Sequence, residues 1–301
     1  MSRPPTFAPP PGTRPLALRT GRGTFAALEA APVARPVTGT ALLLPGFTGS
    51  KEDFIAMLVP LARAGYRVVA VDGRGQYESE GPRNDQSPYA QSELAHDVLA
   101  QAASLSQAAG SGDRGPLHLV GHSLGGQIAR AAVLLDPSPF RSLTLMSSGP
   151  AEVDPVQQQK VVLLSQALTA LPMEEVWDAM QAMEPPVPAP EETATEGRNP
   201  EHEEALRRRW LLHSPAQLIA TGHQLTTEPD RVAALRDTGL PLHVVSGTVD
   251  DTWPVPLLDD MAVRLDAHRT VIKGAGHSPN TDRPDDTARA LAEFWDRHPD
   301  A

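Results

Sequence analysis

The sequence predicts an α/β fold with a mainly parallel central sheet, helices on both faces of that sheet, and a helical cap insertion. Two observations support this prediction. Short, continuously apolar runs such as Thr40–Leu44 and Leu117–Val120 alternate with segments of helical periodicity, which is typical of parallel strands that are buried on both faces. Between about residues 151 and 227 this alternation stops and only helical patterns remain, which indicates an insertion.

The first part of the predicted core covers residues 16–150. It begins with Leu16–Thr20 and Phe25–Ala30, two runs that flank the turn Gly21-Arg22-Gly23 and predict a hairpin. The segments that follow alternate between strand and helix: Thr40–Leu44, Lys51–Ala64, Arg67–Val71, Ser92–Ala109, Leu117–Val120, Leu124–Leu135 and Leu143–Met146.

The second part of the predicted core covers residues 228–301 and returns to the same alternation. Its strands and helices are expected, in chain order, at Leu242–Ser246, Leu257–Leu265, Thr270–Ile272 and Asp285–Arg297. The insertion over residues 151–227 has helical patterns at Pro155–Leu171, Met173–Met183 and Glu201–Leu225, with the breaker-rich stretch Pro185–Pro200 among them. Because ligands of α/β folds bind outside the carboxyl ends of the strands, we expect this insertion to form a cap over that edge.

Charge and composition exclude several classes of protein. The chain has a formal net charge of −11, and its short basic run Arg207–Arg209 follows a group of glutamates. We therefore expect no nucleic-acid partner, because duplex binders need a basic face. The absence of cysteine rules out disulfides and thiolate metal sites. No apolar stretch approaches the roughly 18 residues of a transmembrane helix, and no H-E-x-x-H metal motif occurs.

The N-terminal segment, residues 1–15, is rich in proline and has no apolar stretch of the kind that secretory signals contain. We therefore expect this segment to be extended or disordered. The lack of such a signal, together with the lack of cysteine, predicts a cytoplasmic protein. Nothing in the sequence indicates the oligomeric state.

The strongest chemical signal is the segment Gly121–Gly125, which fits the pattern G-x-S-x-G. It lies directly between a predicted strand and a predicted helix, which is the setting of a nucleophile elbow. The sharp turn projects the serine hydroxyl from the sheet edge, and glycines two residues before and after it let the strand and the helix approach each other. Ser123 is therefore the candidate nucleophile, and the alternative is an ordinary glycine-rich turn.

A serine hydroxyl needs a basic partner, and a histidine in that role needs a carboxylate that orients it. Of the ten histidines, His277 is the candidate base, because it lies on a glycine-rich loop after a predicted strand and before the last helix. His122 adjoins the nucleophile, but its place beside Ser123 is expected to point its side chain elsewhere. The loop after the preceding strand carries two candidate acids, Asp250 and Asp251.

Two backbone N–H groups are expected to stabilise the oxyanion that forms when a carbonyl group is attacked. One belongs to Leu124, the residue directly after the candidate nucleophile. The other belongs to Phe47, in the loop Pro45–Gly49 that follows the first central strand. The alternative is that Pro45–Gly49 is a plain turn that leads into the next helix.

Three apolar side chains are candidate substrate contacts. Trp177 and Met180 lie in the insertion, and Trp253 lies in the loop of the candidate acids. Their apolar character favours a small hydrophobic acyl substrate as the partner of the site. The simpler interpretation of the methionines and tryptophans of the insertion is that they form its own core.

Together these motifs resemble the α/β-hydrolase fold superfamily over roughly residues 16–298. The loop Leu44–Phe47 is similar to the family's His-Gly-x oxyanion loop, with Pro45 in place of the histidine. This replacement leaves the N–H of the candidate donor in place. The loop Asp72–Ser79 is similar to the family's D-x-R-G-x-G-x-S loop, with Tyr77 in place of a glycine, a change expected to narrow the mouth of the pocket.

The acid loop extends this resemblance and implies a function. Gly247–Pro254 is similar to the family's G-x-x-D-x-x-x-P loop, which assigns the acid to Asp250. The resemblance implies a triad of Ser123, Asp250 and His277 that acts without a metal or cofactor. It implies a serine hydrolase, close to a carboxylesterase, that cleaves a carboxylic ester or thioester through an acyl-enzyme. The alternatives on this fold are a perhydrolase, a carbon–carbon bond hydrolase, an acyltransferase and a ligand receptor.

Overall fold

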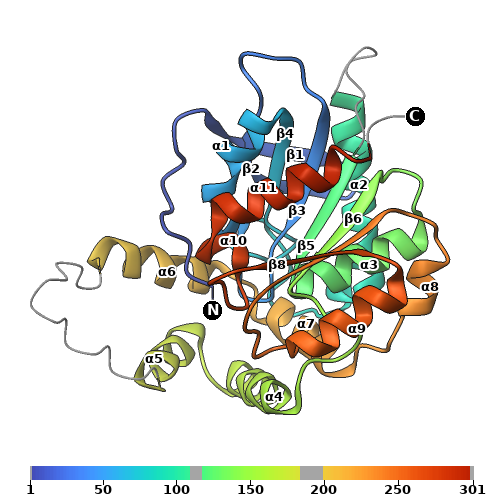
Figure 1. Ribbon diagram of the computed structural model, residues 1–301. Coiled ribbons are helices and arrows are strands. Elements are labelled where there is room, and N and C mark those ends of the chain that lie inside the picture. Colours follow the sequence, from blue (N-terminus) through green and yellow to red (C-terminus); the bar gives the residue numbers. More distant parts are fainter. Residues whose placement is uncertain (1, 109–116, 184–198, 299–301) are drawn as a thin grey trace, which may run out of the picture.

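A computed structural model of the protein describes residues 2–108, 117–183 and 199–298 (Figure 1). The described residues contain one eight-stranded sheet with the strand order β1-β2-β4-β3-β5-β6-β7-β8. In chain order its strands are β1 (Thr13–Thr20), β2 (Gly23–Ala30), β3 (Gly39–Leu44), β4 (Tyr66–Val71), β5 (Leu117–His122), β6 (Ser142–Met146), β7 (Leu242–Gly247) and β8 (His268–Ile272). The predicted α/β fold with a mainly parallel sheet is thus confirmed.

The sheet is antiparallel only at its N-terminal edge. Strands β1 and β2 form the predicted hairpin, in which Thr20 pairs with Gly23, and β2 is antiparallel to β4. All the other neighbouring strands run parallel. The hairpin begins at Thr13, three residues earlier than Leu16, where the sequence predicts it.

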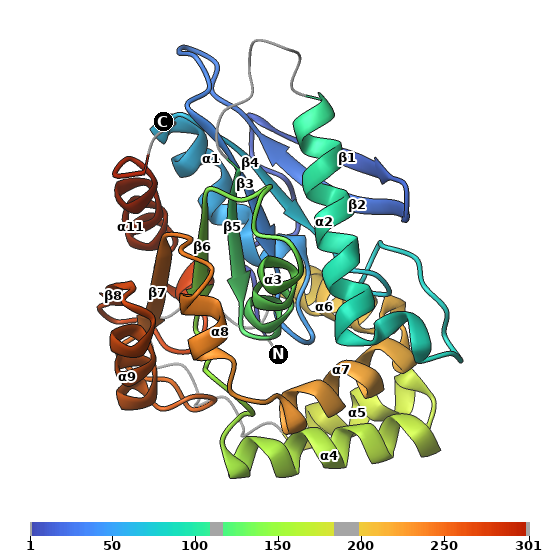
Figure 2. The same ribbon diagram turned by 90° about the vertical axis from the view of Figure 1, so that its right-hand side faces the viewer.

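Helices cover both faces of the sheet (Figures 1 and 2). The helices outside the insertion are α1 (Ile55–Ala64), α2 (Gln91–Ala108), α3 (Leu124–Leu135), α8 (Val232–Arg236), α9 (Val255–Leu265), α10 (Pro279–Asp282) and α11 (Pro284–Trp295), with short 3₁₀ turns η1 (Lys51–Phe54) and η2 (Ser87–Tyr89). Helices α1 and α11 pack on one face, and α2, α3 and α9 on the other. The residues of β3 alternate between these layers, because Leu42 and Leu44 join one core cluster and Ala41 and Leu43 join the other. This two-sided burial explains why the predicted strands are continuously apolar.

Five helices lie between β6 and β7 in the described part of the chain. They are α4 (Pro155–Ala170), α5 (Met173–Met183), α6 (Pro200–Leu212), α7 (Pro215–Thr227) and the short α8 (Val232–Arg236). In Figures 1 and 2, α4 to α7 lie together beyond one end of the central strands. The breaker-rich stretch that the sequence places at residues 185–200 lies almost entirely outside the described residues.

The segment Glu201–Leu225 contains most of α6 and most of α7, which are separated at His213 and Ser214. Both residues have extended backbone, with ψ angles of 145° and 124°. For Ser214 the reason is that proline disfavours the helical conformation of the residue before it. Pro215 then occupies the first turn of α7, where its missing N–H costs nothing. The Ser214 hydroxyl accepts a hydrogen bond from the Gln217 N–H at 3.2 Å and so caps the new helix.

The N-terminal segment, residues 2–12, runs along the protein before β1 and contacts α6. Arg3 pairs with Glu203 on that helix, with 2.8 Å between Nη1 and Oε1. The ring of Phe7 lies 5.6 Å from that of His202 and 6.4 Å from that of Tyr77. The described part of this segment is therefore held against the helices that follow β6.

Candidate active site

The candidate nucleophile lies on a sharp turn between β5 and α3. Ser123 has φ 54° and ψ −121°, a conformation that costs a non-glycine residue on the order of 1–3 kcal/mol. A Cβ built on Gly121 would lie 2.3 Å from the carbonyl oxygen of Gly125, and one built on Gly125 would lie 2.5 Å from that of Leu44. Only glycine therefore fits at these two positions, which lets β5, α3 and the end of β3 pack closely around the serine.

The structure brings Ser123, His277 and Asp250 into one chain of hydrogen bonds. The Ser123 Oγ lies 3.1 Å from Nε2 of His277, and Nδ1 of His277 lies 2.9 Å from Oδ1 of Asp250. Each residue follows the carboxyl end of its own strand: Ser123 after β5, Asp250 after β7 and His277 after β8. Residues 127 positions apart in the sequence, Ser123 and Asp250, are thus joined through a single imidazole ring.

Asp250 is held as a carboxylate. Burial by itself raises its pKa, but the hydrogen bond from His277 and those from the backbone N–H groups of Thr252 and Trp253 outweigh it and hold the pKa below its usual value. The two backbone groups donate to Oδ1 at 2.9 and 3.1 Å. An ionised Asp250 favours the tautomer in which His277 carries its proton on Nδ1 and leaves Nε2 free to accept one.

The neighbouring acid, Asp251, has a different environment. Its side chain is exposed, and its Oδ2 accepts a hydrogen bond of 3.0 Å from Nε2 of Gln157 on α4. The geometry therefore supports Asp250 as the carboxylate that orients His277.

His122 supports the loop of the candidate base, a role that the sequence analysis missed. Its side chain points toward the loop of His277, and its ring centroid lies 5.2 Å from that of His277. Its Nε2 lies 2.9 Å from the backbone carbonyl of His277 and must carry the proton, since a carbonyl only accepts. Burial lowers the pKa of His122 to about 4, so the ring is neutral at pH 7.

The loop that carries Phe47 lies directly against the nucleophile. A Cβ built on Gly46 would lie 3.3 Å from the Cβ of Ser123 and 3.3 Å from Nδ1 of His122, so a side chain there would crowd both. Gln76 anchors the loop, because its Nε2 donates to the carbonyl of Gly46 at 2.9 Å. No sequence signal singled out Gln76, which lies 30 residues away. Leu124 is the first residue of α3 and is fully buried; its role and that of Phe47 as oxyanion donors stay predictions.

The three candidate substrate contacts are largely buried. Trp177 packs with Trp210 in a core shared by α4 to α7, and Met180 lies partly buried against that cluster. Trp253 has no exposed surface and donates from Nε1 to the carbonyl of Ala151 at 3.1 Å. Its ring centroid lies 6.2 Å from that of His277. This burial favours a structural contribution by the two tryptophans, while contact with substrate stays a prediction.

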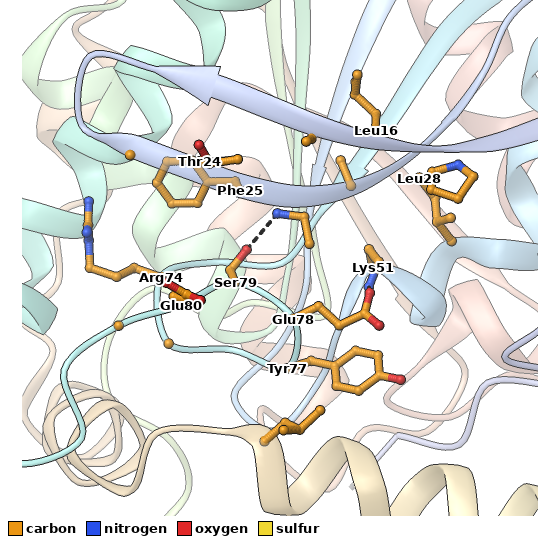
Figure 3. A pocket seen from close by; sticks show the side chains of 18 of the residues that line it. Leu16, Thr24, Phe25, Leu28, Lys51, Arg74, Tyr77, Glu78, Ser79 and Glu80 are labelled. Carbon is orange, nitrogen blue, oxygen red and sulfur yellow. Dashed lines mark hydrogen bonds and ion pairs between the residues drawn. The ribbon is translucent and has the colours of Figure 1, made fainter.

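Tyr77 lines a cavity of about 1220 Å³ that lies away from the candidate triad (Figure 3). This cavity lies between the β1–β2 hairpin, the N-terminal segment and the loop that follows β4, and the candidate triad is not part of its lining. The ring of Tyr77 lies 4.6 Å from Nζ of Lys51, which itself pairs with Asp72 at 2.9 Å and Glu78 at 2.8 Å. Tyr77 is thus placed over this cluster of charges.

The described residues contain no group of three or more histidine, aspartate or glutamate side chains that could hold a metal ion. Among the same residues, none of the helices combines the length and the apolar character needed to cross a bilayer.

Comparison with known proteins places the chain in a family. The sequence model of the Alpha/beta hydrolase family matches residues 41–290, and the chain therefore belongs to that family, whose members the sequence motifs resemble.

Individual relatives are more distant. The chain is 34% identical over 114 residues to the protein named "Putative carbamate hydrolase RutD" of Variovorax paradoxus, which is 38% of this chain and 40% of that protein. It is 30% identical over 184 residues to 2-succinyl-6-hydroxy-2,4-cyclohexadiene-1-carboxylate synthase of an Enterobacter species, which is 58% of this chain and 65% of that one. The matches thus span less than two thirds of either relative. A thermophilic esterase from Thermogutta terrifontis has a similar fold, with a TM-score of 0.70 at 19% identity over 95% of this chain and all of that one.

Proposed function

We propose that the protein is a serine hydrolase that cleaves a carboxylic ester or thioester through an acyl-enzyme intermediate. The observation that carries this proposal is the hydrogen-bonded chain from Ser123 through His277 to Asp250, with distances of 3.1 and 2.9 Å. A serine with φ 54° at a strand-to-helix turn supports it, because such strain concentrates at functional sites.

In the first half of the proposed reaction, the Oγ of Ser123 attacks the carbonyl carbon of the substrate. His277 Nε2 takes the hydroxyl proton, and the carbonyl electron pair moves to oxygen. Asp250 stabilises the imidazolium that forms but keeps its own charge. The backbone N–H groups of Phe47 and Leu124 are proposed to donate to the new oxyanion, a contribution typically worth about 10²–10³ in rate for each donor.

In the second half, the tetrahedral intermediate collapses and the leaving alcohol or thiol receives the proton from His277. A water molecule then attacks the acyl-enzyme while His277 takes its proton. Collapse of the second intermediate returns this proton to Ser123 and releases the carboxylic acid. The neutral ring of His122, which is bonded to the carbonyl of His277, adds no positive charge beside the base.

The helices α4 to α7 are proposed to form a cap over the triad. Phe47 packs both against the core that lies beneath it and against the cluster formed by these helices. A Cβ built on Gly222 of α7 would lie 3.3 Å from the Phe47 ring. This close cover fits the low exposure of Ser123, 6%, and favours a substrate whose apolar part is enclosed.

A second candidate function is a different reaction at the same triad, and the names of the two relatives support including it. One name describes a carbamate hydrolase and the other a synthase, so a carbamate and a carbon–carbon bond substrate belong in the test. A panel of esters and thioesters with acyl chains of graded length, carbamates, and a substrate with a cleavable carbon–carbon bond would rank these classes by kcat/KM.

The decisive experiment combines turnover with active-site labelling. We expect the purified protein to hydrolyse p-nitrophenyl butyrate and to react with a fluorophosphonate probe, and we expect Ser123→Ala to lose both. Ser138→Ala, at an exposed serine after α3, is the matched control and should keep both. A wild-type protein that is folded but shows neither turnover of any member of the panel nor labelling would overturn the proposal.

A further inference from the structure

The loop that carries Phe47 is held by side chains from outside it. On one side, Gln76 donates to the carbonyl of Gly46. On the other side, the ring of His213 lies between two backbone carbonyls, with Nε2 3.1 Å from that of Gly49 and Nδ1 2.8 Å from that of Arg209. At the end of the loop, the N–H of Ser50 donates to Oδ2 of Asp53 at 3.3 Å. The position of the Phe47 N–H therefore depends on these anchors.

Asp53 is itself held by a buried ion pair with Arg209 of α6. Nη1 of Arg209 lies 2.8 Å from Oδ1 of Asp53, and neither side chain is exposed. Oδ2 accepts from Ser50 and also from the Ser2 hydroxyl at 2.6 Å. A Cβ built on Gly49 would lie only 2.3 Å from this Oδ2, so the carboxylate packs directly against the loop. A shift of the Asp53 carboxylate must therefore move the backbone beside Phe47.

Arg209 lies in the last turn of α6 and His213 directly follows that helix. Arg209 contacts Asp53 and His213 contacts the loop of Phe47. They are four residues apart, so their side chains project from neighbouring positions. The helix end is fixed in turn, because the N–H of Ser214 donates to the carbonyl of Gly75 at 2.8 Å and its hydroxyl donates to that of Pro82 at 2.7 Å. Docking of α6 on the loops that follow β3 and β4 thus places both side chains at once.

The 3₁₀ turn η1, which contains Asp53, also contacts α10, the short helix that follows the loop of the candidate base. Nδ2 of Asn280, three residues after His277, donates to the backbone carbonyl of Asp53 at 2.9 Å, and Asn280 is fully buried. Asp53 therefore lies between the loop of Phe47, through its carboxylate, and the loop of His277, through its backbone.

From these contacts we infer that Arg209 is a positioning residue, which holds the loop of the Phe47 oxyanion donor in its active geometry through Asp53. The inference rests on the proposed serine hydrolase function. Arg209 does not touch the reacting atoms. It acts on the transition state, because the contact with the oxyanion forms only there, and small displacements of a donor lower kcat rather than substrate binding.

The first experiment compares two substitutions of the same kind. Arg209→Lys keeps the charge but loses the planar group that spans Asp53 and its neighbours. Arg130→Lys is the matched control, because Arg130 forms an equally buried ion pair of 2.9 Å with Glu228 and bonds the carbonyls of Gly149 and Pro150. We expect both variants to have a lower melting temperature than the wild-type protein. Only Arg209→Lys should lower kcat for p-nitrophenyl butyrate, by about 10- to 100-fold with little change in KM.

A second measurement separates positioning from general damage to the fold. A trifluoromethyl ketone forms a tetrahedral adduct with the serine and places an oxyanion where the transition state has one. Its inhibition constant should rise in Arg209→Lys by about the factor by which kcat/KM falls, whereas that of an uncharged, non-covalent substrate analogue should stay the same. Arg130→Lys should change neither constant.

If Arg209→Lys does not fold, the pair Asp53→Asn with Arg209→Gln removes both charges and leaves no unpaired buried ion. This double variant should also lower kcat and weaken the binding of the ketone. The inference is overturned if a folded Arg209 variant keeps the wild-type kcat and ketone affinity, or if Arg130→Lys loses as much of both. Such results leave the proposed function intact. That proposal fails only if the wild-type protein itself neither turns over any substrate of the panel nor reacts with the fluorophosphonate probe.

Discussion

Nε2 of His122 donates a hydrogen bond of 2.9 Å to the backbone carbonyl of His277. The residue before the candidate nucleophile therefore holds the loop of the candidate base, and the two rings lie 5.2 Å apart. This bond spans 155 residues of sequence and links β5 to the loop after β8, two elements that must keep a fixed distance for Ser123 and His277 to meet.

We predict that His122→Ala lowers kcat by about tenfold or more. The substitution leaves the buried carbonyl of His277 without its donor, a loss of on the order of 1–3 kcal/mol, and frees the loop to move away from Ser123. Ester hydrolysis and thermal unfolding of the variant would check this. His223→Ala, at an exposed histidine of α7, is the control, and equal kcat values for the two variants would contradict the prediction.

The buried histidines predict that stability falls as the pH is lowered through the weakly acidic range. Burial lowers the pKa of four histidines. The pKa falls to about 3 for His118, to about 4 for His122 and His213, and well below the usual value for His243. In the unfolded chain these groups take up protons near pH 6.5, whereas in the folded protein they do so only at lower pH. The unfolded state thus binds more protons between about pH 6.5 and 4, and the free energy of unfolding rises with pH across this window.

Urea unfolding between pH 4 and 7 measures this slope, and His118→Gln should flatten it. His118 is fully buried and its Nδ1 lies 2.8 Å from the Ser142 hydroxyl, a contact that glutamine can keep. His223→Gln, at the exposed site, should leave the slope unchanged. A slope in His118→Gln as steep as that of the wild-type protein would show that His118 does not contribute.

Substitution of the two neighbouring aspartates should separate their roles. Asp250→Asn keeps a side chain of the same shape but favours the wrong tautomer of His277, so kcat should fall by about 10⁴. Asp251→Asn should keep kcat within about twofold, since Asp251 is exposed and bonded to Gln157. Activity lost only in Asp251→Asn would move the acid to that residue.

A glycine pair gives a test of the close packing around the nucleophile. Gly125→Ala would place a Cβ 2.5 Å from the backbone carbonyl oxygens of Leu44 and Pro45. Because backbone atoms, unlike a flexible side chain, cannot move away to relieve this clash, we expect a large decrease in both melting temperature and activity. Gly21→Ala, in the hairpin turn, meets nothing within 4 Å and should change neither by much. A Gly125→Ala enzyme with wild-type kcat and melting temperature would show that the turn relaxes more than this geometry allows.

Much of the fold follows from local patterns in the sequence. Runs such as Thr40–Leu44 are continuously apolar because β3 is buried on both faces, and the glycines around Ser123 are needed because backbone approaches them from β3 and α3. The break before α7 also had a local signal, since Ser214-Pro215 combines a helix cap with a residue that favours a helix start.

The sequence alone determined the α/β fold, the turn that presents Ser123, and the loops on which Asp250 and His277 lie, because each depends on residue types that are adjacent in the chain. Tertiary structure alone decided which distant side chains support them. Gln76 and His122 hold loops 30 and 155 residues away, and Arg209 reaches Asp53 across 156 residues. No local pattern encodes such contacts, because they arise only when folding brings separate loops to one edge of the sheet.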